Sequence, residues 1–351
     1  MIPDNNTAGR RYANKLGTPW DGENNEVALK TELSKSINIR PFRLREDLPS
    51  VQKLWDDTLG AHWTNPYDDI RECLTGSQQY RAGDHLLALE HGKTIGFVAT
   101  QTDTSQSSAS EAGLLLLMVS PERQRQGIGS LLLDAAIVHL RDAGVNEVRL
   151  GQGPHSYFWA GVPDTCRGAA RFFEINGWRL NGSYTDMVCD VRTISDNGRF
   201  IDKMNEQGFV LKKPTENDLA DLLAFEQLHF PDWHEYFCET LRKHGSECLL
   251  VAKSPSGEII GTAVLTSASR GSARAWCGLL GDDMGAFGCV GVRSDLRGRG
   301  IGAAITMKAL LTLRTWGVKN CYIHWVWSTD WYRKFGCTAW RSFRRGVMTL
   351  K

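Results

Sequence analysis

Val119-Ser-Pro-Glu-Arg-Gln-Arg-Gln-Gly-Ile-Gly-Ser130 and Val292-Arg-Ser-Asp-Leu-Arg-Gly-Arg-Gly-Ile-Gly-Ala303 follow one pattern within this chain. An apolar, strand-like run precedes each stretch, and an amphipathic, helix-like run follows it. Both helical runs end at a Gly-Val pair, Gly144-Val145 in the first case and Gly317-Val318 in the second. Because the stretches lie 173 positions apart in a chain of 351 residues, the sequence indicates an internal duplication.

Both stretches carry the residues that a phosphate group needs. A strand that turns through Gly-x-Gly into a helix leaves several backbone N–H groups without carbonyl partners, at the positive end of the helix dipole. Glycine lets a phosphate approach the backbone, and Arg and Gln side chains add donors. We therefore predict that a phosphorylated cofactor contacts Gln124, Arg125, Gln126, Gly127, Ile128, Gly129 and Ser130 in the first stretch and Arg297, Gly298, Arg299, Gly300, Ile301, Gly302 and Ala303 in the second.

Three kinds of phosphate-binding loop compete for this pattern. A dinucleotide loop needs a third glycine where this chain has Leu132 and Ile305, and a P-loop needs Gly-Lys-Ser/Thr, which neither stretch contains. The pattern Arg/Gln-x-x-Gly-x-Gly/Ala fits both stretches, and it resembles the acetyl-CoA loop of the GNAT acetyltransferase superfamily. The alternative is a glycine-rich turn that holds no ligand.

Composition argues against several other classes of protein. The chain has 41 basic and 40 acidic residues and a net charge of +1, which argues against a nucleic-acid partner. No apolar run reaches the length of a membrane span, and the polar N-terminus lacks the apolar core of a signal peptide. Nine cysteines without Cys-x-x-Cys spacing favour reduced thiols, and no metal site is expected. We therefore expect a cytoplasmic protein, with a nuclear location as the alternative.

Local patterns predict two α/β domains joined by a linker. Residues 1–36 are polar and are expected to form a flexible extension. The order of strand-like and helix-like runs in residues 37–191 repeats in residues 208–351, with residues 192–207 between them. We predict two tandem domains, each a mixed, largely antiparallel sheet flanked by helices. Since a duplicated domain imitates a dimer, either a monomer or a homodimer is expected.

The GNAT resemblance implies a geometry for the cofactor. In that superfamily the two strands that flank the cofactor helix splay apart, and the pantetheine arm of acetyl-CoA lies along the first of them. The resemblance places this arm along Val290, Gly291 and Val292 in the second half and along Leu117, Met118 and Val119 in the first. It implies direct attack of a neutral amine on the thioester carbonyl, helped by a backbone donor, a proton acceptor and a proton donor.

The two halves differ at the residue that GNAT enzymes use as general acid. The resemblance implies a tyrosine four residues before a glycine, and Tyr332 precedes Gly336 in this way. The first half has Phe173 at the same distance from Gly177, and a phenyl ring cannot donate a proton. We therefore predict that the C-terminal domain catalyses and that the N-terminal domain does not. The alternative is that Tyr332 is an ordinary packed aromatic residue.

The proton acceptor has two candidates. Asp283, with Asp282 beside it, precedes the strand expected to contact the cofactor, where bases of the superfamily often lie, and His324 lies on the strand opposite. A base needs only reach and a suitable pKa. The alternatives are a solvated carboxylate, a core histidine, or a water chain with no single base.

The acceptor side of the C-terminal domain is rich in aromatic residues. Aromatic faces with nearby carboxylates suit sugar rings, so we predict substrate contacts from Trp233, His234, Asp282, Trp325 and Trp327, with core packing as the alternative.

Two stretches sharpen the expected activity. Cys321–Gly336 and Tyr157–Pro163 resemble segments of tandem GNAT proteins that include glucosamine and glucosaminide N-acetyltransferases, and the resemblance covers roughly residues 37–351. It implies acetyl-CoA as the cofactor and a small-molecule amine, an amino sugar, as the acceptor. Two other hypotheses are a protein-lysine or histone acetyltransferase and a non-catalytic sensor of acetyl-CoA or an amino sugar.

Overall fold

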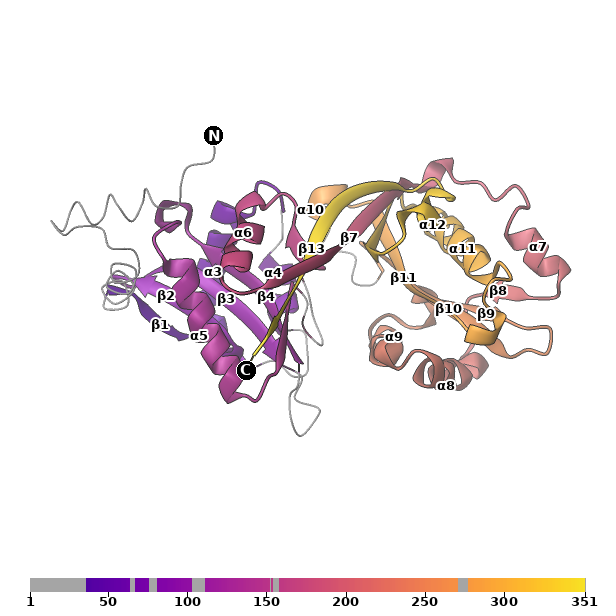
Figure 1. Ribbon diagram of the computed structural model, residues 1–351. Helices are drawn as coiled ribbons and strands as arrows, with labels where there is room; N and C mark the ends of the chain where they lie inside the picture. Colours follow the sequence, from indigo (N-terminus) through magenta and orange to yellow (C-terminus); the bar gives the residue numbers. More distant parts are fainter. Residues whose placement is uncertain are drawn as a thin grey trace. The chain divides into compact units, whose positions relative to one another are not determined.

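The computed structural model describes residues 36–63, 67–75, 81–102, 111–151, 153, 158–270 and 277–350 (Figure 1). Nearly all of the predicted extension, residues 1–36, lies outside this range, as do residues 152 and 154–157 of the aromatic loop. The chain divides into two compact units, one made of Met1–Ser183 with Phe343–Lys351 and the other of Tyr184–Ser342.

These units divide the chain differently from the predicted domains. The chain leaves the first unit within strand β7 (Arg179–Asp190) and returns to it within strand β13 (Thr338–Thr349). The predicted linker, residues 192–207, belongs to the second unit and contains helix α7 (Ile201–Glu206). The predicted boundaries, 37–191 and 208–351, therefore stay a prediction about the duplicated sequence, whereas each compact unit includes a strand segment from the other half.

The first unit is a sheet with helices on both faces. Its elements are β1 (Asn38–Pro41), α3 (Leu44–Thr58), α4 (Tyr67–Thr75), β2 (His85–Glu90), β3 (Lys93–Thr102), β4 (Glu111–Val119), α5 (Ile128–Asp142), β5 (Glu147–Leu150), β6 (Val162–Pro163) and α6 (Arg167–Ile175). The strand order is β1-β2-β3-β4-β5 followed by the end of β13, and all these pairs are antiparallel except β4 with β5. Helices α5 and α3 lie on opposite faces (Figure 1).

The second unit repeats this arrangement. Its elements are β8 (Val210–Lys212), α8 (Leu219–His229), α9 (Pro231–His244), β9 (Leu249–Lys253), β10 (Ile259–Ser267), α10 (Cys277–Leu280), β11 (Met284–Val292), α11 (Ile301–Thr315), β12 (Asn320–Val326) and α12 (Thr329–Arg333). The strand order is β8-β9-β10-β11-β12 followed by the end of β7, and only β11 and β12 are parallel.

The core of the second unit has two layers, one on each face of its sheet. Side chains alternate between the faces along β10, as expected for a strand. Ala263 packs in the layer of α11, with Ile305 and Phe287, whereas Val264 packs with Leu222 of α8 in the other layer. Figure 1 shows α8 and α9 on one side of β10 and α11 on the other. The residues of β10 on either side of Ala263 therefore face α8.

Both sheets open at the strand pair that precedes the glycine-rich turn. Pairing of β4 with β5 covers Glu111–Leu114, and pairing of β11 with β12 covers Met284–Ala286. Beyond these residues β4 and β11 continue to their turns, and no described residue pairs with them in a ladder on that side. This confirms the predicted mixed α/β fold with a splayed central strand pair in each half.

Three further findings concern the described part of the chain. None of its helices combines the length and apolar composition needed to cross a membrane. Within the same residues, no group of three or more His, Cys, Asp and Glu side chains is arranged to hold a metal ion. Eight cysteines are described, all as free thiols.

Candidate active site

The predicted cofactor loop of the second unit is the turn between β11 and α11. Gly298 and Gly300 have φ angles of 81° and 88°, in the left-handed region that favours glycine. A Cβ atom at either position would meet nothing within 4 Å, so backbone conformation rather than crowding requires glycine here. The Ala304 N–H donates to the Gly300 carbonyl at 3.0 Å. The N–H groups of residues 301–303 precede this helical hydrogen bond, and such groups can bind an anion.

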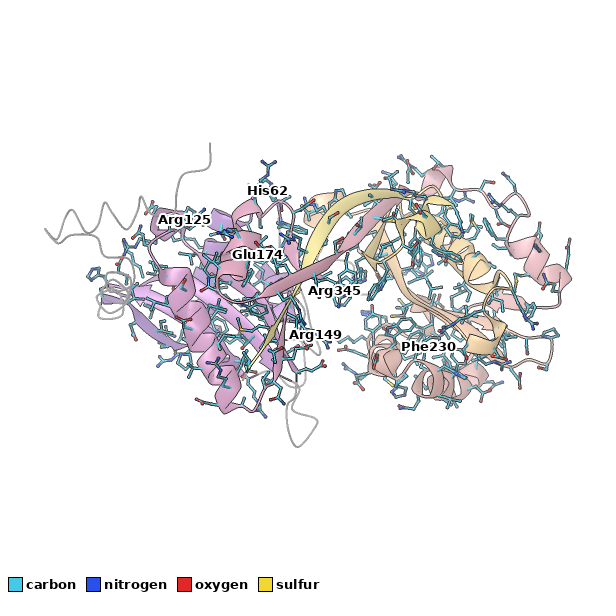
Figure 2. The ribbon with its side chains drawn as sticks, in the orientation of Figure 1. His62, Arg125, Arg149, Glu174, Phe230 and Arg345 are labelled. Atoms are coloured by element: carbon cyan, nitrogen blue, oxygen red, sulfur yellow. The ribbon has the colours of Figure 1, made fainter. Side chains whose placement is uncertain are left out.

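The first unit has the same turn, with a different residue at one of its two left-handed positions. Gly127 has a φ angle of 87°, and Arg125 occupies the position of Gly298 with a φ angle of 61°. Figure 2 labels Arg125 in the first unit. The left-handed conformation costs a non-glycine residue about 1 kcal/mol or more. The backbone shape of the turn is therefore kept although its sequence differs.

A side chain ties each turn to the end of its strand. Gln124 donates from Nε2 to the carbonyl of Val119 at 3.0 Å. Arg297 donates from Nε to the carbonyl of Val292 at 3.2 Å. The residues predicted to bind the cofactor thus form equivalent loops in the two units, while their contact with a cofactor stays a prediction.

The helix that carries the predicted acid packs against the first turn of the cofactor helix. A Cβ atom on Gly129 would lie 3.4 Å from the ring of Phe172, and one on Gly302 would lie 3.8 Å from the ring of Trp331. The two rings are equivalent, and so are the residues that follow them, Phe173 and Tyr332. The sequence comparison of these two positions therefore has a structural basis.

Tyr332 lies in the second unit beside the splayed strand. Its ring is half-buried, with its centroid 6.1 Å from that of Phe287 on β11. Phe173, by contrast, is buried and packs edge-on against Trp178 at 5.5 Å. Burial is the main cause that raises the pKa of Tyr332 to about 12, with smaller contributions from Cys337, Cys321 and Cys289. The phenol therefore keeps its proton at neutral pH and can donate it.

Strand β11 contains a bulge near Tyr332. Cys289 and Val290 together face Ala263, because the pairing shifts between positions 262 and 264 of β10. Cys289 has a φ angle of 50°, whereas no residue of β4 has a positive φ. A bulge releases a backbone N–H from the ladder, and a released N–H suits a donor to a carbonyl oxygen. Strand β4 also has an extra residue, Leu115, where its pairing with β3 shifts, but that residue has no positive φ angle. The two units therefore both release a backbone N–H here, and they differ in the backbone conformation at the bulge.

The predicted pantetheine strand is covered by an aromatic pair. Gly291 faces Phe230, and a Cβ atom added to Gly291 would come within 2.6 Å of that ring, so only glycine fits. Phe230, labelled in Figure 2, joins α8 to α9 and stacks on Trp233 at 4.9 Å and 11°. Trp233 therefore lies on the same face of β11 as Gly291 and Cys289, and its predicted contact with substrate stays a prediction. Val290 and Val292 pack on the opposite face, in the α11 layer.

Three further polar residues were candidates for the site. Asp283 pairs with Lys319 at 2.7 Å just before the paired end of β11. It is five residues from the bulge region at Gly288, about 17 Å along an extended strand. Asp282 precedes Asp283, and its side chain is exposed. His234 contacts Cys238, one turn along α9. Asp282 and Asp283 thus precede the bulge by several residues, and the roles of all three side chains stay predictions.

His324 does face the bulge region. Its Nε2 lies 3.9 Å from the point where a Cβ atom of Gly288 would stand, and its ring stacks on Tyr322 at 5.7 Å and 12°. Burial lowers the pKa of His324 to about 4, because an imidazolium is disfavoured away from water. His324 is therefore neutral at pH 7.

Trp325 and Trp327 form an aromatic group with Tyr184. Tyr184 stacks on Trp325 at 5.6 Å and 21° and meets Trp327 edge-on at 4.8 Å and 87°. Trp327 is 76% exposed, which is unusual for so large an apolar side chain. Tyr184 belongs to β7, more than 130 residues earlier in the chain, so no local motif connects it with the two tryptophans.

Asp186 holds the backbone beneath this aromatic group. It is buried, and its Oδ1 accepts a hydrogen bond from the Trp325 N–H at 3.0 Å, while its Oδ2 accepts one from the Tyr322 hydroxyl. Trp325 has a φ angle of 61° at an irregularity of β12. Burial raises the pKa of Asp186 to about 6. A single acid in a strand of mixed polar and apolar residues is a weak sequence signal for the burial of Asp186.

Glu226 of α8 is the other group that the sequence analysis missed. It has no exposed surface. Its Oε1 accepts a hydrogen bond from the Thr262 hydroxyl at 2.6 Å, and its Oε2 is buried with no hydrogen-bond partner. Burial raises the pKa of Glu226 to about 7. An acid among the polar residues of a helix gives no sequence signal of this burial.

This arrangement of sequence and structure is similar to that of known proteins. Residues 48–176 and 216–337 match the profile of the acetyltransferase (GNAT) family. The chain is 31% identical, with a TM-score of 0.83, to a GCN5-related glucosamine N-acetyltransferase region of a fungal multi-domain GH3 β-N-acetylglucosaminidase. That match covers 89% of this chain and 38% of the fungal one, so this chain spans less than half the length of that protein.

Two more distant structures share the fold. A GCN5-related N-acetyltransferase from Sphaerobacter thermophilus is 17% identical with a TM-score of 0.67, over 90% of this chain and 96% of that one. A tandem GNAT protein from the clavulanic acid biosynthesis pathway is 14% identical with a TM-score of 0.61, over 89% and 98%. A search of curated proteins gave no match. The predicted tandem arrangement is confirmed by the double family match and by these structures.

Proposed function

Because this chain belongs to the GNAT acetyltransferase family and carries its domain twice, we propose that it transfers an acetyl group from acetyl-CoA to the primary amine of an amino sugar, glucosamine or a glucosaminide. The observation that carries this proposal is the combination found in the second unit. A strand with a left-handed residue at Cys289, a turn whose free amides can bind an anion, and a phenol that keeps its proton lie on β11, at the beginning of α11 and on α12.

Different residues of the second unit would have different roles in the reaction. The amides of residues 301–303 would hold the diphosphate, and β11 would align the pantetheine arm beside Gly291. Acetyl-CoA, when bound, supplies the acetyl group as a thioester. The N–H released at the Cys289 bulge would stabilise the carbonyl oxygen as negative charge develops on it. Tyr332 would give its proton to the departing sulfur.

The first unit fits a different role. Its loop has the backbone shape of the second, but Phe173 replaces the phenol and packs in the core. We infer that it binds the cofactor without catalysis or braces the catalytic unit. Either role needs the backbone of the loop and not the chemistry of a side chain.

An amino sugar is favoured as acceptor by the aromatic residues of the second unit. The C–H face of a sugar ring packs on an aromatic ring, and Trp327 offers an exposed ring beside Tyr184. The fungal region similar to this chain is described as a glucosamine N-acetyltransferase, which supports the same substrate class.

Release of free thiol from acetyl-CoA tests the proposal. We expect release with glucosamine and with its β-1,4-linked disaccharide. N-acetylglucosamine, which has the ring without a free amine, serves as the matched control and should give none. Release only with a histone-tail peptide would identify a protein acetyltransferase instead. Binding of acetyl-CoA in a calorimeter without release by any amine would identify a sensor.

A further inference from the structure

The two units can be aligned residue by residue at their first helices. Asp47 accepts a hydrogen bond from the Arg43 N–H at 2.7 Å, and Asp218 accepts one from the Thr215 N–H at 2.8 Å, each at the beginning of a helix. Eight residues further along, the first unit has Trp55 and the second has Glu226. Both side chains are buried, with 1% and 0% exposure.

The strands align in the same way. Gly96 pairs with Val119 and Gly261 pairs with Val292, the residues that end the two cofactor strands. The next residue of β3 is Phe97, and that of β10 is Thr262. Three positions before the strand ends, the first unit has Leu116 and the second has Cys289. The first unit therefore has Trp, Phe and Leu where the second has Glu, Thr and Cys.

The fold does not require a carboxylate at this place. Burying a carboxylate is costly unless its oxygens are paired, and Oε2 of Glu226 has no partner. Trp55 shows that the same position of the same fold accepts an apolar ring. A polar group kept at a cost, in the unit that also keeps the phenol, points to a role in the reaction.

Glu226 lies beside the part of β11 where the acetyl group would be held. Its partner Thr262 pairs with Gly291 in the ladder, so the carboxylate faces the middle of the cofactor strand. Cys289 at the bulge interacts electrostatically with Glu226 and with Tyr332. Thr262 faces α8, whereas Tyr332 packs in the layer of α11. Glu226 and Tyr332 thus approach the bulge from opposite faces of the sheet.

We propose that the unpaired Oε2 of Glu226 accepts the proton of the acceptor amine. This inference rests on the proposed function. The amine nitrogen forms a bond to the carbonyl carbon, and the bond from that carbon to sulfur breaks. The proton of the amine passes to Glu226, and Tyr332 gives its own proton to the sulfur. Glu226 then releases its proton to solvent, and the phenol is reprotonated.

Burial favours Glu226 over His324 as the base. Removal from water raises the pKa of Glu226 to about 7 and lowers the pKa of His324 to about 4. A base with a pKa near 7 is matched to neutral pH, and it binds a proton about 1000-fold more tightly than a base with a pKa near 4. Asp283 is already paired with Lys319.

Because the Glu226 carboxylate is buried, it can act as a base only if the amine can reach it. Glu226 has no exposed surface in the protein without substrate, so the amine must reach it beside the Phe230–Trp233 pair, directly or through one water. The groups found to interact with Glu226 are Thr262 from β10 and the Cys289 thiol from β11.

Glu226→Gln in the full chain tests the proposal, with the exposed Glu235→Gln on α9 as the matched control. We expect kcat/KM for glucosamine to fall about 100-fold or more and its acid limb near pH 7 to disappear. The affinity for acetyl-CoA should stay unchanged, and the thermal midpoint should not fall, because a buried charge has been removed. Glu235→Gln should behave as wild type. A carboxylate with a merely structural role would instead lower the thermal midpoint and keep the acid limb.

Two further variants make the outcome decisive. Glu226→Asp keeps the carboxylate, so it should keep the acid limb with reduced kcat even if the Gln variant folds poorly. An acid limb that survives in Glu226→Gln and disappears in His324→Gln overturns the proposal in favour of His324. Wild-type protein that releases no thiol with any amine would contradict the proposed function itself, which is a separate outcome.

Discussion

The first unit and the second unit have the same turn between strand and helix but different residues beside it. Arg125 adopts the left-handed conformation that Gly298 provides, so the backbone shape is kept despite the substitution. Elsewhere in the two units, the first has Phe173 and Trp55 at the positions where the second has Tyr332 and Glu226. Backbone amides can bind a phosphate whatever the side chains of the turn are, whereas proton transfer needs particular side chains. The difference shows that one fold can keep the turn while the residues proposed for the chemistry change.

Of the changes to residues that differ between the units, removing the phenol of Tyr332 should have the largest effect. In Tyr332→Phe, we expect thiol release to fall about 100- to 1000-fold, because no group is left to protonate the sulfur. Affinity for acetyl-CoA, measured by calorimetry, should not change. Adding Phe173→Tyr should restore nothing, since the first unit has no carboxylate at Trp55. Restored turnover would show that the first unit can catalyse.

The buried carboxylate should make stability depend on pH. The pKa of Glu226 is 4.5 in an unperturbed chain and about 7 in the folded protein, so the folded state holds the proton more tightly. Its contribution to stability is therefore present below pH 4.5 and is lost as the pH rises through 7, by about 3 kcal/mol.

Glu226→Gln isolates this contribution. Urea denaturation at several pH values between 5 and 8 should show a shallower decline for the variant than for wild type, because the slope from Asp186 remains in both. If the unfolding free energies of wild type and variant change with pH in parallel, Glu226 keeps an ordinary pKa. The difference between Glu226 and Trp55 would then not affect the pH dependence of stability.

Asp186 should matter mainly for the acceptor. In Asp186→Ala, the Tyr322 hydroxyl and the Trp325 N–H lose their buried acceptor, which costs about 2 kcal/mol of unfolding free energy. We expect KM for glucosamine to rise about tenfold while KM for acetyl-CoA stays the same, because the aromatic group loses its support. Asp190→Asn, further along β7 and partly exposed, is the control. An equal rise in both KM values would indicate general loosening.

The smallest effect is expected from exchanging the residues of the two turns. Gly298→Arg should lower the unfolding free energy by about 1 kcal/mol, because a Cβ atom finds open space there but the left-handed backbone remains unfavourable. Arg125→Gly should raise it by less than that, since glycine also gains entropy in the unfolded chain. If Arg125→Gly and wild type have the same unfolding free energy, the left-handed conformation of Arg125 carries no strain.

The confirmed predictions, the tandem arrangement and the mixed α/β fold with splayed strand pairs, came from short contiguous motifs and from the family that they resemble. The roles of the two turns and of Tyr332 stay predictions. The proposed base was missed because its contacts come from segments distant in sequence. Glu226 meets Thr262 36 positions away, and Asp186 meets Tyr322 136 positions away. Asp283 was a candidate because it precedes β11; the splay of β11 begins several residues later, and the role of Asp283 stays a prediction.

The sequence by itself determined the duplication, the family and the unequal halves, because these depend on backbone turns and on one side chain at a set distance from a glycine. Only the tertiary structure decided which carboxylates are buried and what surrounds the tryptophans. Burial and pKa depend on every element packed around a group, and strand pairing brings Tyr184 and Asp186 from the first half of the chain into the second unit.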